Sequence, residues 1–536
     1  MTSIMTFPAT RREILYGSRI VRCFADRPAN IDALFRAAVA DAPDRDALVL
    51  DALVLDAGRI SYRELDRRVE AIASNLLALG LEPDARVALL LGNGFAFVEA
   101  VLATARAGLI AVPMNIRQRR PEIEFVLNQC QASVLIYDAE HEPNLPGRAS
   151  VPSLGHVFVV GGEGGGADAF ETLHHEGAGR TMPDVGQERP FCLLYTSGTT
   201  GKPKGAILTH VGVVHSVLHF AHGFRLGEGD VSILAVPASH VTGLVAIVLT
   251  MLHARGTVVI MPQFKARRFL EVATAEKMTY TLIVPAMYNL CLLDPDFESF
   301  DLSAWRAAGF GGAPMPSATI ERLKQVLPSL TLINCYGSTE TSSPATLLPF
   351  GDIATHPESV GRVLPCADLV VLGEDGREVA PGESGEIHIA GPMVVPGYWD
   401  NPEADRTGFV GGYWVSGDVG SKDADGYVHV FDRKKDMINR AGFKIYCIEV
   451  ESVLSQHPAV IESAVIGKPD PVLGERVHAF VYNGGRQADA AELKAYCTQR
   501  LSDYKVPDAF TFIDAPLPRN ANGKILKIAL RDLLPA

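Results

Sequence analysis

The sequence lacks any long uninterrupted apolar run and any secretory signal. Its longest apolar stretch, 243–252, is about ten residues, too short to cross a bilayer as a helix. The N-terminal residues contain no continuous apolar segment of the kind that marks a signal peptide. We therefore expect a cytoplasmic protein with no transmembrane segment, unless something outside the sequence tethers it.

Paired cysteines and an excess of positive charge are also lacking. The eight cysteines are scattered, with no C-x-x-C pair and no metal-ligand spacing. Such cysteines are typical of reduced thiols in a cytosolic protein. The formal net charge of −13 argues against attraction of the whole protein to nucleic acid or to anionic lipid. A polyanionic ligand must therefore meet a local cluster of basic residues.

What the sequence does contain is a regular alternation of helical patterns and short apolar strands, from about residue 30 to 340. Residues 63–81 place apolar side chains on one helical face, and 85–91 follow as a buried strand. Helices that alternate with near-continuous apolar strands predict sheets covered by helices. The chain therefore belongs to the α/β class, and its 536 residues are enough for two or more domains.

Two changes in pattern predict the domain organisation. Beyond about residue 360, short strands are broken by Gly and Asp turns, which predicts a small β-barrel-like subdomain. A mixed helix and strand pattern resumes after Lys435. We expect a large N-terminal domain (1–434) with two helix-covered mixed or parallel sheets, and a small, mobile α+β C-terminal domain (435–536).

The stretch DALVLDALVLD (46–56) is a tandem copy of a five-residue unit. Because five is odd, a copy absorbed within one strand would reverse the face of every following side chain. We expect the copy to lengthen a hairpin or bulge at the surface, without a catalytic role.

The segment YTSGTTGKPKGA (195–206) combines three glycines, several hydroxyls and two lysines between two apolar runs. Glycines let backbone N–H groups turn toward an anion, and hydroxyls and lysines add further donors. The segment is not the P-loop of nucleotide hydrolases, because Pro203 stands where a magnesium-binding hydroxyl is required. If the order of these residues had no significance, the alternative would be a solvated Gly/Ser hairpin without a ligand.

The order of these residues resembles the signature of the adenylate-forming enzymes, which include acyl-CoA synthetases, aryl-CoA ligases, luciferases and peptide-synthetase adenylation domains. In that family this loop closes over the β- and γ-phosphates of ATP. The resemblance continues in register over nearly the whole chain, through GFGGAP (309–314), NCYGSTET (334–341), YWVSGDVG (413–420), residues 431–451 and PRNANGK (518–524).

The resemblance implies a role for individual residues. The catalytic residues would be Lys524, Glu340, Thr339 and His240, with Mg²⁺ held by Glu340 and Thr196. The ATP-binding residues would be Thr196, Ser197, Gly198, Thr199, Thr200, Gly201, Lys202, Lys204, Gly311, Gly312, Ala313, Tyr336, Gly337, Asp418, Arg433 and the hinge residue Lys435. The acyl pocket would include Val241, Gly243, Met287, Gly309, Phe310, Gly311, Cys335 and Ser338, and CoA would meet Arg440, Gly442, Phe443 and Lys444.

The implied activity is that of an AMP-forming carboxylic acid:CoA ligase that uses ATP, Mg²⁺ and CoA. The pocket segments contain no Arg or Lys, which disfavours a diacid. The segment PASHVTG (237–243) has no Asp to hold an α-ammonium group, which disfavours an amino acid. A fatty or aryl monocarboxylic acid is therefore expected as the substrate. Asn439 departs from the Lys that many relatives carry there.

Three alternatives remain open at this point. The acyl group could pass to a carrier-protein thiol, the adenylate could be oxidised as in luciferases, or the chain could be a catalytically silent homologue. Joint retention of Thr196, Lys204, Glu340, Asp418 and Lys524 disfavours the silent homologue. The sequence does not indicate the chain length or ring preference of the acid, nor the oligomeric state.

Overall fold

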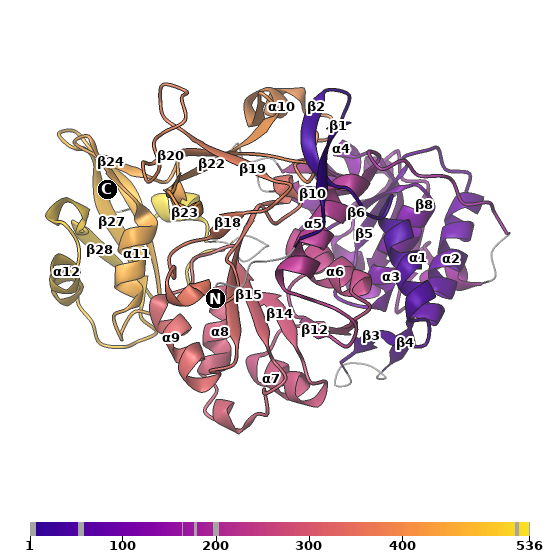
Figure 1. Cartoon of the computed structure of the whole chain (residues 1–536), viewed down its shortest axis with the longest axis horizontal. Coiled ribbons are helices and arrows are strands. Elements are labelled where there is room, and N and C mark those ends of the chain that lie inside the picture. The colour runs from indigo at the N-terminus through magenta and orange to yellow at the C-terminus, as the bar shows by residue number, and fades with distance from the viewer. Residues whose placement is uncertain are drawn as a thin grey trace. The chain divides into compact units, whose positions relative to one another are not determined.

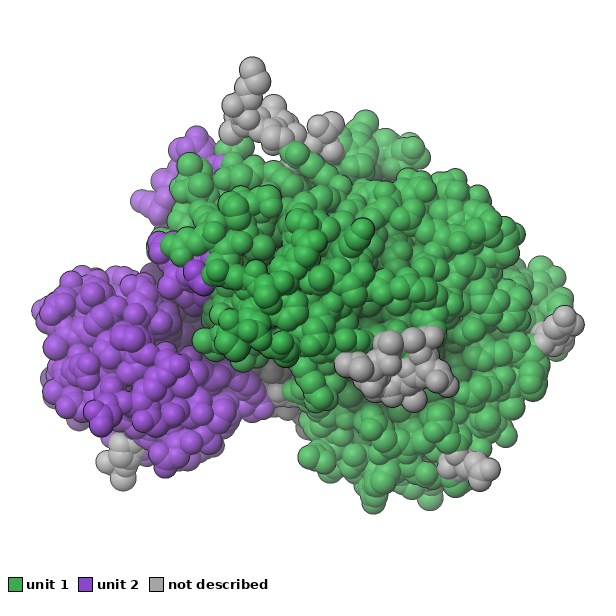
Figure 2. Space-filling view, turned by 90° about the horizontal axis from the view of Figure 1, so that it is seen from below, with its two compact units in different colours: residues 1–313, 323–369, 389–415 green, residues 314–322, 370–388, 416–536 purple. Residues whose placement is uncertain are grey.

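The computed structural model describes residues 7–51, 58–162, 165–175, 179–196, 203–519 and 525–534. The chain forms two compact units, coloured separately in Figure 2. Unit 1 comprises 1–313, 323–369 and 389–415, and unit 2 comprises 314–322, 370–388 and 416–536. The domain boundary expected at Lys435 stays a prediction. Among the described residues, no helix has the length and apolarity needed to cross a membrane.

Unit 1 contains a seven-stranded sheet that is parallel except at one edge (Figure 1). The edge pair β10–β11 is antiparallel, and the remaining neighbours run parallel. The strand order is β11 (Lys204–Thr209), β10 (Pro190–Thr196), β6 (Ile110–Pro113), β5 (Arg86–Leu90), β7 (Ala132–Asp138), β8 (His156–Val160) and β9 (Asp168–Ala169).

A second sheet of unit 1 has a parallel centre with antiparallel strands at its ends. Its strands follow in the order β18 (Gly361–Val363), β17 (Thr346–Leu347), β16 (Thr331–Tyr336), β15 (Ala307–Gly311), β14 (Tyr280–Ile283), β12 (Val231–Leu234), β13 (Thr257–Ile260), β3 (Asp46–Leu50) and β4 (Arg59–Ser61). The first copy of the tandem repeat is β3 itself, whereas residues 52–55 of the second copy lie outside the described residues. The two helix-covered mixed sheets expected from the sequence are confirmed.

Helices of unit 1 pack between and beside these sheets (Figure 1). They are α1 (Ile31–Asp41), α2 (Tyr62–Ala78), α3 (Phe95–Arg106), α4 (Arg120–Gln129), α5 (His210–Gly223), α6 (Thr250–His253), α7 (Ala266–Ala275), α8 (Pro285–Leu292) and α10 (Pro402–Gly408). In α2, Ser61 accepts a hydrogen bond from the Glu64 amide and caps the helix. Its predicted apolar face is buried, except for half-buried Leu77.

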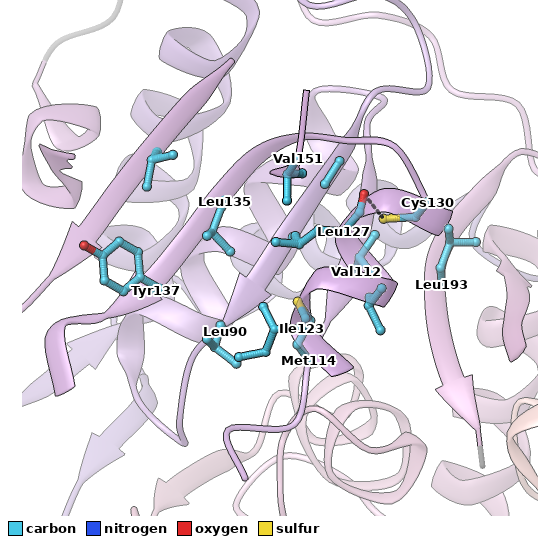
Figure 3. Packing of buried hydrophobic residues seen from close by; sticks show 14 of the residues in the cluster. Leu90, Val112, Met114, Ile123, Leu127, Cys130, Leu135, Tyr137, Val151 and Leu193 are labelled. Atoms are coloured by element: carbon cyan, nitrogen blue, oxygen red, sulfur yellow. Dashed lines mark hydrogen bonds between the residues drawn. The ribbon is translucent and has the colours of Figure 1, made fainter. Parts of the chain in front are cut away.

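The core of the seven-stranded sheet is apolar and continuous (Figure 3). Side chains from β5, β6 and β7 meet Ile123 and Leu127 of α4, and all of them are almost fully buried. Side chains of the strands and of α4 therefore pack together on this face of the sheet. This packing holds α4 beside β10.

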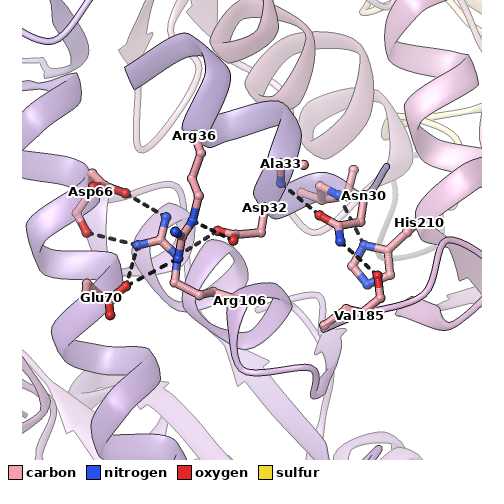
Figure 4. A network of polar contacts seen from close by, with 10 residues as sticks. Asn30, Asp32, Ala33, Arg36, Asp66, Glu70, Arg106, Val185 and His210 are labelled. Atoms are coloured by element: carbon pink, nitrogen blue, oxygen red, sulfur yellow. Dashed lines mark hydrogen bonds and ion pairs between the residues drawn. The ribbon is translucent and has the colours of Figure 1, made fainter. Parts of the chain in front are cut away.

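A buried arginine joins three helices of unit 1 (Figure 4). The guanidinium of Arg106 on α3 pairs with Asp32 of α1 at 2.6 Å, and with Asp66 and Glu70 of α2 at 2.6 and 3.1 Å. Its fixed fork of five N–H donors suits three carboxylates at once. The network therefore sets the mutual positions of α1, α2 and α3.

Unit 2 contains a small β region followed by an α/β region. The β region has the strand order β19 (Asp368–Leu372), β20 (Gly385–Ala390), β22 (Tyr413–Lys422) and β23 (Tyr427–Arg433). The α/β region has a sheet in the order β25 (Phe443–Ile445), β24 (Ile438–Arg440), β27 (Gly474–Tyr482) and β26 (Glu462–Asp470), with β28 (Ala509–Ile513) beside β27. Its helices are α11 (Cys447–Ser455), α12 (Ala490–Thr498) and α13 (Lys527–Arg531).

Helix α5 buries several histidines in their neutral form. His215 donates from Nδ1 to the Val211 carbonyl at 2.8 Å and accepts the Phe24 amide at Nε2. His219 is fully buried against the Phe24 ring, and neither of its ring nitrogens has a hydrogen-bond partner among the described residues. Burial lowers the pKa of His210 and of His215 to about 4, and lowers the pKa of His219 well below its usual value.

These depressed pKa values predict loss of stability in mild acid. Between the ordinary histidine pKa of about 6.5 and pH 4, the unfolded chain binds protons that the folded chain does not. The free energy of unfolding should therefore fall as the pH drops through this window, by on the order of 3 kcal/mol for each of His210 and His215. Denaturation midpoints at pH 7.5, 6 and 5 measure the slope. His219→Phe should reduce the slope by about one proton, and an unchanged slope would contradict this assignment.

Candidate functional site

The candidate phosphate-binding segment connects two paired strands. Strands β10 and β11 form an antiparallel hairpin in which Thr196 lies opposite Lys204. The apolar runs on both sides of the segment are thus strands, as predicted. Ser197, Gly198, Thr199, Thr200, Gly201 and Lys202 lie outside the described residues, so their roles stay predictions. The described ends place a hydroxyl and an ammonium group on facing strands.

The last residues of β10 contact the end of α4. The Tyr195 hydroxyl donates to Gln129 Oε1, and Gln129 Nε2 donates to the Trp399 carbonyl at 2.7 Å. The Tyr195 ring lies close over Gly205, where a Cβ would come within 3.1 Å of it. With a larger residue at position 205, the Tyr195 ring would have to shift slightly.

The outer edge of β11 is covered by residues 394–399, which we call the edge segment. The Ile207 amide donates to the Gly397 carbonyl at 3.1 Å, and the Trp399 amide donates to the Gly205 carbonyl at 2.7 Å. A Cβ at position 397 would lie 2.8 Å from the Asp405 carboxylate, which would then have to move. Arg19 of β2 (Arg19–Phe24) donates to the carbonyls of residues 394, 395 and 396 at 3.1–3.3 Å. The edge segment is therefore fixed on both sides.

Glu340 lies in a short 3₁₀ turn, Thr339–Thr341, that follows β16. Its side chain is only 8% exposed, and Thr339 is buried to the same degree. The Ser338 hydroxyl donates to Oε2, the Tyr398 hydroxyl donates to Oε1 at 3.0 Å, and the Thr196 hydroxyl lies 3.5 Å from Oε1. The structure thus brings together the two residues predicted to hold a metal ion.

Tyr398 lies between Glu340 and the cation of β11. The Lys204 Nζ is 5.3 Å from the centre of the Tyr398 ring, within the range of a cation–π interaction. Burial, and secondarily the negative charge of Glu340, raises the pKa of Tyr398 well above its usual value. The hydroxyl is therefore protonated at neutral pH and acts as the donor to Glu340.

The predicted adenine-binding backbone lies at the carboxyl ends of β15 and β16. Gly311 ends β15, and a Cβ there would lie 2.4 Å from the Cys335 carbonyl of β16. Gly312 follows with φ of +76°, which favours glycine. Gly312 and Ala313 are exposed, and Tyr336, next to Gly337, ends β16. Bare backbone is thus presented where parallel strands end, the usual ligand position in open α/β sheets.

The predicted acyl-pocket residues come from several elements of unit 1. His240 and Val241 precede an eight-residue π-helix, Thr242–Leu249, a form that is frequent at functional sites. The predicted apolar side chains, Val241, Met287, Phe310 and Cys335, are all buried. Gly243 and Gly309 have no room for a Cβ, which would lie 2.3 Å from the Pro237 carbonyl and 2.8 Å from the Phe224 ring respectively.

The protonation state of His240 follows from its contacts. Its Nδ1 accepts the Thr242 amide at 3.3 Å, so the proton of the neutral ring is on Nε2. Burial lowers the pKa of His240 below its usual value. The residue therefore offers one neutral N–H donor and an aromatic face rather than a positive charge.

In unit 2, Asp418 and Arg433 lie opposite each other on β22 and β23. Arg433 Nε is 2.8 Å from Asp418 Oδ1, and Arg433 also donates to the Ser416 carbonyl at 3.0 Å. The Asp418 carboxylate is nearly buried. The pair holds a carboxylate in a fixed orientation, as recognition of a diol would require.

The predicted hinge and CoA residues follow directly in the chain. Lys435 is exposed in the turn between β23 and β24. Gly442 has φ of +89° in the two-residue turn between β24 and β25. Arg440 pairs with Asp508 at 2.9 Å, and Lys444 pairs with Glu374 at 2.7 Å. Phe443 is half exposed and stacks on Tyr504 with ring centres 4.6 Å apart.

Lys524 lies outside the described residues, together with 520–523. The residues on either side of this stretch, Arg519 and Ile525, form an antiparallel bridge. The predicted catalytic role of Lys524 therefore stays a prediction.

Oxygen donors at Glu340 suit a hard cation. Described His, Cys, Asp and Glu side chains nowhere gather in threes to make a dedicated metal cage. Mg²⁺ does not need such a cage, because it commonly takes one or two carboxylates, retained waters and substrate phosphates. A carboxylate has about four acceptor positions, and the contacts to Ser338, Tyr398 and Thr196 leave room for a metal ion.

The sequence prediction missed Tyr398 and Gln129. Both act through contacts with residues far away in the chain, Glu340 and Tyr195 respectively. A lone sequence offers little signal for either. The run Gly397-Tyr398-Trp399 between two turns could have indicated a buried aromatic contact, without indicating its partner.

This chain is similar to known proteins over most of its length. The family model "AMP-binding enzyme" matches residues 35–399, and "AMP-binding enzyme C-terminal domain" matches 449–524. A feruloyl-CoA synthase of Amycolatopsis sp. is 37% identical, over 88% of this chain and 93% of that protein. The long-chain-fatty-acid–CoA ligase FadD13 of Mycobacterium tuberculosis is 34% identical over the same shares. The structure of an o-succinylbenzoate CoA synthetase from Bacillus subtilis with ATP and magnesium superposes with a TM-score of 0.82, at 28% identity over 93% of this chain and 99% of that one.

Proposed function

Because this chain belongs to the AMP-binding enzyme family and is an acyl-CoA ligase of that family, we propose that it activates an apolar monocarboxylic acid on the surface built by β10–β11, Glu340 and Tyr398. Such ligases use ATP, Mg²⁺ and CoA. The observation that carries the proposal is the placement of Lys204, Thr196 and Glu340 around one point of unit 1.

The chemistry requires two anions to approach each other. A carboxylate is a poor acyl donor, since its leaving group would be an oxide. When its oxygen attacks the α-phosphorus of ATP, the new O–P bond replaces the bond to pyrophosphate, and AMP becomes the leaving group. Charge neutralisation at the meeting point is therefore the main task of the protein.

Residues of unit 1 supply part of that neutralisation. We assign the hydroxyl of Thr196 and the ammonium group of Lys204 to the phosphates, together with the backbone of 197–202. Glu340 would hold Mg²⁺, and its orientation is fixed by Ser338 and Tyr398. When bound, Mg²⁺ offsets part of the triphosphate charge. Thr339 would contact the α-phosphate.

Residues of unit 2 serve the nucleotide and the second step. Asp418, held by Arg433, would accept the ribose hydroxyls. Lys524 would neutralise the reacting carboxylate and α-phosphate. In the second step the CoA sulfur attacks the acyl carbon, and AMP leaves. Arg440 and Lys444 would exchange their carboxylate partners for CoA phosphates after rotation at Lys435.

The side chains assigned to the pocket favour an aryl or aliphatic tail. Val241, Met287, Phe310 and Cys335 are apolar, and the pocket segments contain no Arg or Lys to pair with a second carboxylate. The neutral His240 would form an aromatic wall and cannot replace such a cation. Acids of the kind named for the similar proteins, ferulate and long-chain fatty acids, fit these side chains.

The eight buried, unpaired cysteines support a cytoplasmic location. Burial raises the pKa of Cys192 and of Cys335, which keeps both thiols protonated and unreactive. A reducing compartment would preserve them in this state.

Pyrophosphate release from ATP tests the proposal. The acids should include ferulate, a long-chain fatty acid, malonate and an amino acid, each with and without CoA. We expect pyrophosphate release with ferulate and with the long-chain fatty acid, but not with malonate or the amino acid. Once CoA is added, mass spectrometry should detect the corresponding thioesters. No release with any acid would refute the activity, adenylate without thioester would refute CoA as the acceptor, and preference for malonate would refute the pocket assignment.

Lys524→Ala should separate the two half-reactions. Adenylate formation should fall by at least about 100-fold, since the ammonium group stabilises charge that shifts as the O–P bond forms. Thioester formation from added acyl-adenylate and CoA should change much less. Lys494→Ala, at an exposed position on α12, is the matched control. Equal losses in both half-reactions would contradict the assignment.

A further inference from the structure

Tyr398 is a buried tyrosine whose polar and aromatic parts contact two different charged residues. Only 7% of it is exposed. Its hydroxyl donates to Glu340 Oε1 at 3.0 Å, while the Lys204 ammonium lies 5.3 Å from the centre of its ring. One side chain thus separates a carboxylate from an ammonium group, and contacts both.

The main chain fixes where this ring lies. Tyr398 forms an antiparallel bridge with Ala206 of β11, and its amide donates to Asp405 Oδ1 at 2.7 Å. The hydrogen bonds of Gly397 and Trp399 with β11 lie on either side of it. Tyr398 therefore keeps a constant position relative to Lys204, two residues away along the strand that it pairs with.

The same edge segment also holds the main chain of Glu340. The Val395 amide donates to the Glu340 carbonyl at 2.9 Å. Backbone and carboxylate of Glu340 are thus both fixed by residues 395–398. Because the Ser338 hydroxyl binds the other carboxylate oxygen, loss of the Tyr398 hydroxyl would leave Oε1 with a single contact among the described residues, to Thr196 at 3.5 Å.

We propose that Tyr398 is a positioning residue for the activation step: its hydroxyl orients the Glu340 carboxylate toward the metal ion, and its ring keeps Lys204 from pairing with Glu340. This inference rests on the proposed function. In the part of the chain that the structure describes, Lys204 lies over the Tyr398 ring, and the Glu340 carboxylate contacts only the hydroxyls of Ser338, Tyr398 and Thr196. An ion pair between Lys204 and Glu340 would cancel the two charges that the metal ion and the phosphates require. Partners that orient a metal ligand typically change metal affinity by about 10–100-fold when removed.

Binding of Mn²⁺ tests the hydroxyl directly. The full chain is mixed with α,β-methylene-ATP, which cannot react at the α-phosphorus, and free Mn²⁺ is followed by electron paramagnetic resonance. Tyr398→Phe should weaken Mn²⁺ binding by about tenfold, with metal-free binding of the nucleotide changed less than about twofold. Tyr62→Phe is the matched control, because it removes a buried hydroxyl that donates to the Gly256 carbonyl at 2.7 Å. It should leave Mn²⁺ affinity unchanged.

A double-mutant comparison separates positioning from packing. If Tyr398 acts through Glu340, Tyr398→Phe should have no further effect on Mn²⁺ affinity in a Glu340→Gln background. An equal loss in both backgrounds, or no loss in the native background, would overturn the proposal. Tyr398→Leu removes the ring as well, and should also weaken metal-free nucleotide binding several-fold because Lys204 can then reach Glu340. Unchanged metal-free binding would refute the role of the ring.

Two further controls keep the outcome interpretable. Should Tyr398→Phe fail to fold, 3-fluorotyrosine at position 398 retains the hydroxyl and reports by ¹⁹F resonance. That resonance should shift when Mg²⁺ is added to the nucleotide complex, and a static resonance would contradict the proposal. Failure of the native chain to bind Mn²⁺ with the nucleotide, or to release pyrophosphate, would refute the proposed function itself.

Discussion

The candidate site depends on the pairing of a single edge strand. Strand β11 is bonded to β10 on one side and to the edge segment 394–399 on the other. This pairing places Lys204 opposite Thr196 and beside the Tyr398 ring. Tyr398 in turn reaches Glu340, which lies in the turn that follows β16 of the other sheet of unit 1. Positions of the opposite charges are therefore set by backbone hydrogen bonds rather than by the side chains alone.

Such rigidity matters because the protein is acidic overall and its substrates are anions. Two unit charges about 4 Å apart at a protein surface interact by roughly 4 kcal/mol, so one misplaced cation changes the barrier appreciably. Unit 1 keeps Lys204 over an aromatic ring instead of against a carboxylate. In unit 2, by contrast, Arg433, Arg440 and Lys444 each pair with a carboxylate. In the proposed second step Arg440 and Lys444 would exchange their carboxylates for an anionic ligand, whereas Arg433 would keep Asp418 in place.

Much of the fold was predictable because the spacing of apolar residues along the chain indicates helices and strands locally. The apolar spacing of 63–81 predicted α2, and the runs on either side of 195–206 predicted β10 and β11. Glu340 and Asp418 lie in local motifs that resemble those of a known family, so they were proposed from that resemblance, and their roles stay predictions. Tyr398 and Gln129 were not proposed, because their contacts join segments 58 and 66 residues apart. The strand within the tandem repeat 46–56 could not be predicted either, because the two copies are identical and either could pair in the sheet.

A crystal structure of the full chain with ATP and Mg²⁺ tests the central claim most directly. We predict that the β- and γ-phosphates lie within hydrogen-bond distance of the backbone of 197–202 and of Lys204, with the metal ion bound to Glu340. A triphosphate bound elsewhere, or a metal ion that does not contact Glu340, would contradict this account.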